Sequence, residues 1–169
     1  EYERRTEFRL SVLHRSSRAA LGLAAQGLVH VAGLHLSTSA RPEQNLRAAR
    51  DALGSGFRLL RGARWQDGVA LAPASGVRSV RGALGNRRFR WVGREPGSGA
   101  RECFDELTHC RVRPRHLASD HRGVAEAVRC GWADAGVCVR LACDEAQLRF
   151  LEVREEMYDL CFPARYERD

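Results

Sequence analysis

The segment Gly97-Ser98-Gly99-Ala100-Arg101 combines residue types that bind anions at the start of a helix. Its glycines, including Gly99, let the backbone approach a ligand closely, and the first N–H groups of a helix lack partners and favour negative charge. Ser98 adds a hydroxyl, and Arg101 adds a guanidinium suited to an oxyanion or a carboxylate. The segment therefore predicts either an anion-binding turn or a plain glycine turn with a serine cap.

Serine and histidine also stand at two other expected helix starts. Ser16 and Ser17 precede an alanine-rich run, where they either cap the helix or offer hydroxyls to a ligand. In a later segment we expect Asp120 to cap a helix and His121 to contact a ligand from the first turn. Ser119 stands beside them, but three adjacent residues cannot form a catalytic triad, whose members come from separate loops. If a helix start from one half of the chain faces a helix start from the other half, the two together form a pocket for an anion.

Two polar rings lie on expected strands. His35, in the run VHVAGLHL, is either a core histidine or part of a cleft wall. Tyr158, near the carboxyl end, either offers its hydroxyl to a ligand or packs through its ring. We find no paired carboxylates, no nucleophile elbow and no metal-binding box in the sequence. We therefore predict a binding protein rather than an enzyme, with no catalytic residue, no metal site and no cofactor.

The basic residues of the chain are all arginines. The 169 residues include 28 arginines, no lysine and 21 acidic residues, which gives a formal net charge of +7. Such an excess favours nucleic-acid binding when the basic residues form blocks or alternate with aromatic residues. These arginines are instead spread almost evenly from Arg4 to Arg168. We therefore expect a solvated arginine surface, with DNA contacted only through a separate domain.

The six cysteines lack the close spacing of zinc-binding pairs. Most stand in apolar runs such as Val137-Cys138-Val139, where a reduced thiol packs as a small apolar group. Reduced thiols are typical of the cytoplasm. The chain has no apolar run near the roughly 18 residues of a membrane helix, and its start has no apolar signal segment. These features predict a cytoplasmic domain without membrane association.

Expected strands and helices alternate along the chain. The expected strands are 8–13, 29–36, 89–93, 115–118 and 135–139, and residues 149–162 are expected to carry the last strands. Residues 57–73 are expected to form either two strands or one strand that crosses between lobes. The expected helices are 18–26, 42–53, 77–84, 100–108, 121–130 and 141–146. With 44% hydrophobic and 29% charged residues the composition is that of a globular protein. The alternation predicts an α/β fold with mostly parallel sheets.

Four runs, taken in order, resemble a known family. They are ALGLAAQGLVHVAGLHL (20–36), FRWVGREPGSGARECFDEL (89–107), DHRGVAEAVRCGWADAGVCV (120–139) and LRFLEVREEMYDLCFP (148–163). Together they resemble the type II periplasmic-binding-protein-like substrate-binding domain of the molybdate-binding-protein-like family. The resemblance implies two lobes, with residues 1–69 in lobe 1, 70–154 in lobe 2 and 155–169 crossing back to lobe 1. It also implies that a first strand-helix unit is missing ahead of Glu1.

Members of this family often follow a helix-turn-helix or excisionase-like DNA-binding domain and sense a small ligand between the lobes. The resemblance implies an oxyanion-type sensing domain of a cytoplasmic transcriptional regulator, with homodimers as one assembly. The alternative is a solute-binding component of molybdate or tungstate ABC transport. Ala100 and Asp120 stand where members of the family have threonine. The ligand is therefore either an oxyanion or another anionic or polar metabolite. The implied site residues are Ser16, Ser17, His35, Ser98, Gly99, Arg101, Asp120, His121 and Tyr158.

Overall fold

The computed structural model describes residues 5–6 and 8–166 and contains one sheet of six strands in the order β1-β6-β2-β5-β3-β4. The strands are β1 (Ala32–Thr38), β2 (Phe57–Leu71), β3 (Trp91–Arg94), β4 (His116–Ala118), β5 (Ala135–Val139) and β6 (Arg149–Pro163). The helices are α2 (Ser17–Ala25), α3 (Gln44–Leu53), α4 (Val80–Gly85), α5 (Gly99–Thr108), α6 (His121–Arg129) and α7 (Arg140–Glu145), with 3₁₀ turns at Pro73–Ser75 and Ala164–Tyr166. This architecture confirms the expected α/β fold class.

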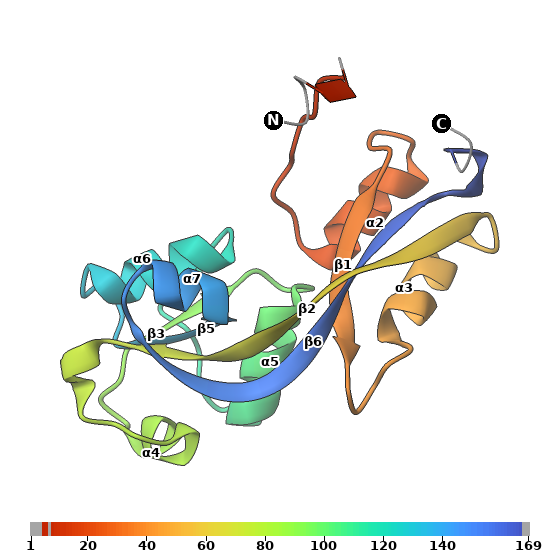
Figure 1. The fold of residues 1–169 in the computed structure, drawn as a ribbon. Coiled ribbons are helices and arrows are strands. Elements are labelled where there is room, and N and C mark those ends of the chain that lie inside the picture. The colour runs from red at the N-terminus through yellow and green to blue at the C-terminus, as the bar shows by residue number, and fades with distance from the viewer. Residues whose placement is uncertain (1–4, 7, 167–169) are drawn as a thin grey trace.

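The strands β2 and β6, each 15 residues long, connect two bodies of the molecule (Figure 1). They pair from Phe57 with Pro163 at one end to Leu71 with Arg149 at the other. Lobe 1 carries β1, α2 and α3, and lobe 2 carries β3 to β5 and α4 to α7 (Figure 1). The boundaries expected after residues 69 and 154 fall inside β2 and β6 and stay predictions.

The strand directions differ from the expectation of mostly parallel sheets. Only the β3–β4 and β3–β5 pairs are parallel. The β1–β6, β2–β5 and β2–β6 pairs are antiparallel. The reason is that the chain enters lobe 2 along β2 and returns along β6 in the opposite direction, so the two crossing strands form an antiparallel ladder.

The expected strand at residues 8–13 is not present. This segment has no regular secondary structure. Its apolar residues are exposed to solvent, with exposed fractions of 70% for Phe8, 62% for Leu10 and 65% for Val12. A strand requires an edge of a sheet to pair with, and no described strand pairs with this segment. The alternation of apolar and polar residues was therefore insufficient evidence for a strand here.

The core of lobe 1 forms where α2 and α3 cover β1. The side chain of Ser16 caps α2 by accepting the Ala19 N–H at 3.3 Å, and Gly27, at a φ of 72°, follows the helix end. The buried residues of this core are Leu21, Ala24, Ala32, Leu34, Leu36, Ala48, Ala49 and Cys161. The first strand of the lobe begins at Ala32, three residues later than expected, because a turn follows α2.

Lobe 2 has a core on each face of its sheet. Val137 and Cys138 are neighbours on β5 and point to opposite faces, as successive strand residues do. Cys138 packs with Val124 and Val128 of α6, and Val137 packs with Phe104 of α5. The two helices thereby cover opposite faces and present their first turns toward lobe 1 (Figure 1).

All six cysteines are free thiols. Four of them are buried, as expected for small core residues, whereas Cys110 and Cys130 are exposed. Within the described part of the chain, no helix has the length and apolar character needed to cross a bilayer.

Candidate functional site

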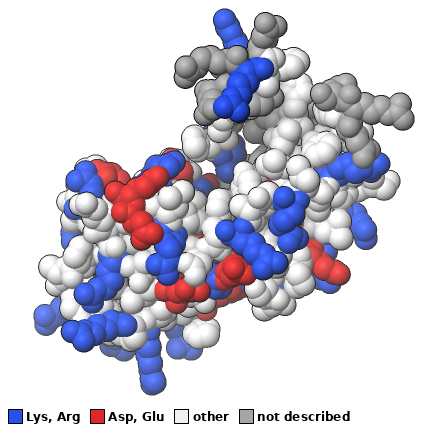
Figure 2. Space-filling model, viewed as in Figure 1, with Lys and Arg blue, Asp and Glu red and all other residues white. Residues whose placement is uncertain are grey.

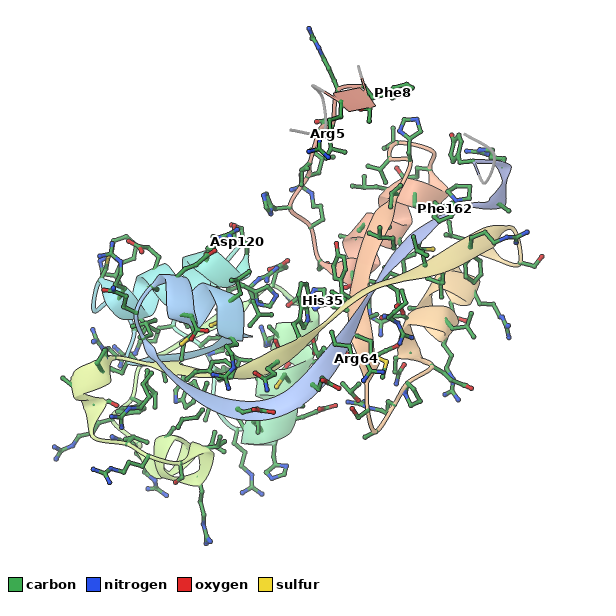
Figure 3. All side chains as sticks on the ribbon, in the orientation of Figure 1. Arg5, Phe8, His35, Arg64, Asp120 and Phe162 are labelled. Atoms are coloured by element: carbon green, nitrogen blue, oxygen red, sulfur yellow. The ribbon has the colours of Figure 1, made fainter. Side chains whose placement is uncertain are left out.

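The candidate site lies where β2 and β6 cross between the lobes. The register places Trp65 opposite Glu156 and Asp67 opposite Arg154, so these side chains occupy one stretch of the crossing strands. His35 of β1 lies beside this crossing, and Asp120 at the start of α6 lies on the lobe 2 side (Figure 3). The surface is hollowed between the two bodies above this point (Figure 2). We call this hollow the interlobe cleft.

Four aromatic rings from both lobes and the crossing strands form a cluster. The ring of His35 lies 5.6 Å from Trp65 and 5.5 Å from His121, measured between centroids. Tyr158 lies 4.8 Å from Trp65. The cluster brings together three residues that the sequence singled out, His35, His121 and Tyr158. Trp65 was not expected, because it stands in a long strand with no helix start or glycine turn nearby.

Two ring N–H groups of this cluster have no acceptor in the part of the chain that the structure describes. Nδ1 of His121 accepts the Val139 backbone N–H at 3.3 Å, so the proton of the neutral ring lies on Nε2. Burial, followed by the charges of His35 and Arg94, lowers the pKa of His121 to about 3 and keeps the ring neutral. Nε2 of His121 and Nε1 of Trp65 are buried without a partner among the described residues.

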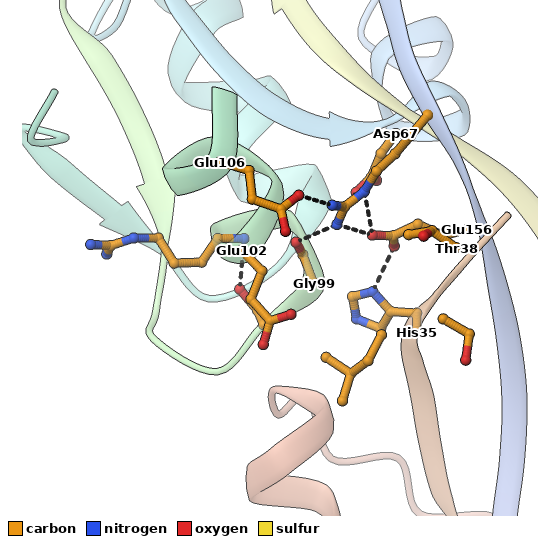
Figure 4. Close-up of polar contacts among 12 residues, drawn as sticks. His35, Thr38, Asp67, Gly99, Glu102, Glu106 and Glu156 are labelled. Atoms are coloured by element: carbon orange, nitrogen blue, oxygen red, sulfur yellow. Dashed lines mark hydrogen bonds and ion pairs between the residues drawn. The ribbon is translucent and has the colours of Figure 1, made fainter. Parts of the chain in front are cut away.

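Beneath the rings lies a buried charge network (Figure 4). Glu156 is fully buried, and its Oε2 lies 3.1 Å from Nδ1 of His35. Nε of Arg154 donates to the other oxygen of Glu156 at 3.1 Å, and Nη2 donates to the Gly99 carbonyl at 3.0 Å. Nη1 of Arg154 reaches Glu106 at 2.9 Å. The network thereby connects β1, β6 and α5, which come from both lobes.

Asp67 and Glu156 are paired carboxylates, contrary to the expectation that the chain has none. Burial and the neighbouring Glu156 raise the pKa of Asp67 well above its usual value. Burial opposes ionisation of Glu156 as well, but the bond from His35 and the charge of Arg154 lower its pKa to about 2. The pair therefore holds one proton on Asp67 and one negative charge on Glu156. No local sequence motif predicts that Asp67 and Glu156 are close, because only the register between β2 and β6 brings the two residues together.

The serine hydroxyls at the helix starts are engaged within the protein. Ser17 Oγ accepts the His35 N–H at 3.2 Å. Ser98 Oγ donates to the Glu95 carbonyl at 3.0 Å and accepts the Arg101 N–H at 3.2 Å. The side chain of Ser16 caps α2, as described above. All three residues are buried, so they shape the wall of the cleft more than they offer free hydroxyls.

The first turns of α2 and α5 lie against each other where the two lobes meet. A Cβ atom on Gly97 would lie 3.7 Å from Ser16 Oγ, and Arg18 pairs with Glu102 at 3.5 Å. A Cβ atom on Gly99 would lie 2.4 Å from the His35 carbonyl oxygen, so only glycine allows this contact. The first turns of α2 and α5, which come from the two halves of the chain, therefore lie together as expected.

Arg101 and Asp120 lie at these helix starts, with their side chains already bonded. Nε of Arg101 donates to both oxygens of Asp105 at 2.9 Å, and Nη1 donates to the Arg94 carbonyl at 3.4 Å. Asp120 accepts the Gly123 N–H at 2.6 Å and so caps α6. Neither residue belongs to the ring cluster, and their roles as ligand contacts stay predictions.

Comparison with solved structures confirms the expected type II periplasmic-binding-protein-like fold, which the chain shares with binding and regulatory proteins. An ABC-type phosphate transport receptor from Vibrio cholerae has a TM-score of 0.60 and 13% identity, over 98% of this chain and 80% of that one. The CcmR regulatory domain of Synechocystis PCC6803, in complex with 2-PG, has a TM-score of 0.67 and 14% identity, over 96% and 78%. An OxyR mutant from Corynebacterium glutamicum has a TM-score of 0.62 and 13% identity, over 99% of this chain but 52% of that one.

Sequence comparison agrees with the structural one. No curated protein matches the chain. The family model described as the PBP superfamily domain matches residues 1–169. A molybdate-specific family and an attached helix-turn-helix domain are not among these matches. From its matched sequence and its fold, the chain belongs to the PBP superfamily domain family.

Proposed function

We propose that this chain binds a small ligand rich in acceptor oxygens in the interlobe cleft and serves as the sensing domain of a regulator. The observation that carries the proposal is the pair of buried N–H donors, Nε1 of Trp65 and Nε2 of His121, that have no acceptor in the described chain. A buried donor without a partner costs about 1–3 kcal/mol. A ligand oxygen placed at the ring cluster would remove this cost for both donors.

The helix starts support the same class of ligand. The first N–H groups of α2, of α5 and of α6 have no acceptor within their own helices, and each helix start favours negative charge. Two of these starts face each other at Gly97 and Ser16. Arg18, at the first turn of α2, pairs with Glu102 of α5 at 3.5 Å and so joins the two helix starts at the rim. Together these groups suit an anionic or polar metabolite with several oxygens.

The buried charges favour a ligand of low negative charge. Glu156 keeps its charge close to Arg154, and Asp67 holds a proton, so the network below the rings is nearly neutral overall. Arg101 is neutralised by Asp105 and supplies no free charge. A dianion would meet Glu156 and Asp120 without a free buried cation. A monoanion or a zwitterion fits this balance better than molybdate does.

The regulatory role rests on how the lobes are joined. Ligand contacts from β1, β2 and α6 would hold both lobes in one arrangement, and closure around a ligand would be transmitted to an attached domain. The CcmR and OxyR similarities support a regulatory use of this fold. We propose a cytoplasmic location and DNA contact by a separate domain. The alternative is a solute-binding component for ABC transport, which the phosphate receptor similarity supports.

A ligand panel with a matched pair of variants tests binding at the cleft. Thermal unfolding is measured with molybdate, tungstate, sulfate, phosphate and amino acids, because a ligand of the native state raises its stability. Compounds that stabilise the chain are then titrated by calorimetry into Trp65→Phe and Trp132→Phe. We expect about tenfold weaker binding for Trp65→Phe, near 1.4 kcal/mol, and no change for Trp132→Phe, whose side chain is 70% exposed. Equal affinity of both variants would refute the proposed site.

A cellular measurement separates the regulator from the transport component. Fractionation of cells that express the full gene product shows whether the domain remains in the cytoplasm. Recovery in an exported fraction would favour the transport alternative, whereas recovery in the cytoplasm together with ligand-dependent transcription would support the regulator.

A further inference from the structure

Seven exposed arginines of lobe 2 lie outside ion-pair distance of every acidic side chain that the structure describes. They are Arg78, Arg81, Arg87, Arg88, Arg111, Arg113 and Arg115. All seven are exposed, and none forms an ion pair with any residue that the structure describes. Elsewhere many arginines do pair, such as Arg122 with Glu145 and Arg129 with Glu126. We call the seven residues the lobe 2 arginine surface.

These arginines come from two segments that lie over the same core. The apolar residues of the segments, which are Val77, Val80, Leu84, Phe89 and Val112, pack against one cluster around Trp91 and Phe104. The backbone N–H of Arg115 donates to the carbonyl of Trp91 at 2.9 Å, which fixes the second segment beside the first. Because the apolar residues face the core and alternate with the arginines, the arginines face solvent. The fold thereby gathers charges that look evenly spread along the sequence.

No acidic residue interrupts either segment. Residues 77–94 and 108–119 contain no aspartate and no glutamate. Without the seven arginines the chain has 21 arginines against 21 acidic residues, so this surface carries the equivalent of the whole net charge of +7. Blue side chains gather at the lower left of the molecule, over the α4 end of lobe 2, with red ones farther up (Figures 1 and 2).

We propose that the lobe 2 arginine surface binds the phosphate backbone of duplex DNA without reading its sequence. Guanidinium groups bind phosphate oxygens in a fixed fork geometry, and each neutralised phosphate releases counterions. The surface has no long helix to enter a groove, because α4 has six residues. It provides no stacking platform for single strands, because its aromatic residue Phe89 packs against the core.

The surface favours a polyanion over a protein partner. Protein interfaces centre on buried apolar or aromatic anchors. Of the exposed large hydrophobic residues of the described chain, only Leu117 lies in residues 77–94 or 108–119, beyond the last of the seven arginines. The proposal adds a contact to the DNA-binding domain that we expect elsewhere, and it does not depend on the ligand cleft. Either proposal can therefore fail without the other.

The test uses fluorescence anisotropy with a 20-base-pair duplex of mixed sequence, titrated at several salt concentrations. The variant Arg87→Gln/Arg111→Gln/Arg113→Gln removes three charges from the surface. The control Arg47→Gln/Arg50→Gln/Arg64→Gln removes three exposed charges from the α3 and β2 side of the molecule. Circular dichroism and the thermal midpoint confirm that each variant is folded.

We expect the lobe 2 variant to bind at least tenfold more weakly than the control. The slope of log K against log salt is expected to fall by about 2 to 3 in magnitude, as for the loss of three phosphate contacts. An equal loss of DNA affinity in the lobe 2 variant and in the control would show that net charge alone attracts DNA and would overturn the proposal. Tighter binding of polyglutamate than of a duplex of the same total charge would also overturn it, in favour of an acidic protein partner.

Discussion

Nδ1 of His35 in lobe 1 lies 3.1 Å from Oε2 of Glu156, a fully buried residue of the return strand β6. The other oxygen of Glu156 accepts from Arg154, which also binds the first turn of α5 in lobe 2. One buried carboxylate therefore holds elements of both lobes. We infer that the arrangement of the lobes depends on this charge and on the groups that surround it.

Glu156→Gln should strongly destabilise the folded chain at pH 7. The amide would leave the guanidinium of Arg154 without its buried counter-charge, and breaking a buried pair in this way costs about 3–5 kcal/mol. Urea unfolding measures the loss. Glu155→Gln is the control, because the neighbouring carboxylate is 40% exposed and should change stability by less than about 1 kcal/mol. Similar losses in the two variants would contradict the role of Glu156.

Asp67→Asn should gain stability relative to the wild type as the pH rises. The folded state keeps a proton on Asp67, whereas the unfolded chain releases it above its ordinary pKa of 3.8. The folded state thus binds more protons, so this residue lowers stability with increasing pH until its folded pKa is reached. An amide stays neutral at every pH.

We therefore expect the difference in unfolding free energy between Asp67→Asn and the wild type to grow from pH 5 to pH 8, by up to about 1.4 kcal/mol for each pH unit over which Asp67 keeps its proton in the fold. Denaturant unfolding at both pH values measures it, and the exposed Asp51→Asn serves as the control. A difference that does not depend on pH would show that Asp67 is ionised in the fold.

His121→Gln should remove part of the acid sensitivity of the fold. The pKa of His121 is lowered from 6.5 to about 3, so the unfolded chain binds a proton in this window that the folded chain does not. Stability therefore falls as the pH drops from 6.5 toward 3. We expect the wild type to lose about 2 kcal/mol more than the variant between pH 7 and pH 5. His116→Gln, on exposed β4, should follow the wild type.

Gly99→Ala should disturb the contact between α5 and β1. The new Cβ atom would lie 2.4 Å from the His35 carbonyl oxygen and 2.8 Å from its Nδ1, and overpacking of this kind costs about 1–3 kcal/mol. Gly22→Ala in α2 is the matched control, since nothing lies within 4 Å of its Cβ position. The control should be neutral or gain up to about 1 kcal/mol. An unfolding midpoint of Gly99→Ala at or above that of Gly22→Ala would rule out the contact.

Much of the fold follows from local sequence signals. Ser16, Ser98 and Asp120 all cap helices, which was the expectation for Asp120 and one of two alternatives for the serines, and apolar periodicity located each later strand and helix. The strand predicted at residues 8–13 failed because the alternation of residue types does not show whether a pairing edge exists. The antiparallel crossing likewise depends on where β6 returns, which no local pattern encodes.

The candidate site was predicted only in part. His35, His121 and Tyr158 do meet, because the elements that carry them were expected at the right places. Trp65 and the pair Asp67 and Glu156 were missed, since they lie in the middle of long strands and meet only through the register. The sequence predicted that Arg101 contacts a ligand, but its guanidinium forms an ion pair with Asp105, four residues later in the same helix.

The most direct test of the central claim observes the indole N–H of Trp65. The chain has three tryptophans, so a ¹⁵N–¹H spectrum contains three indole signals, and Trp65→Phe identifies one of them. A compound that calorimetry shows to bind is added to saturation. We expect the Trp65 signal to shift and its hydrogen exchange to slow, while the signal of the exposed Trp132 stays in place. Saturated binding with an unchanged Trp65 signal would contradict a ligand in the interlobe cleft.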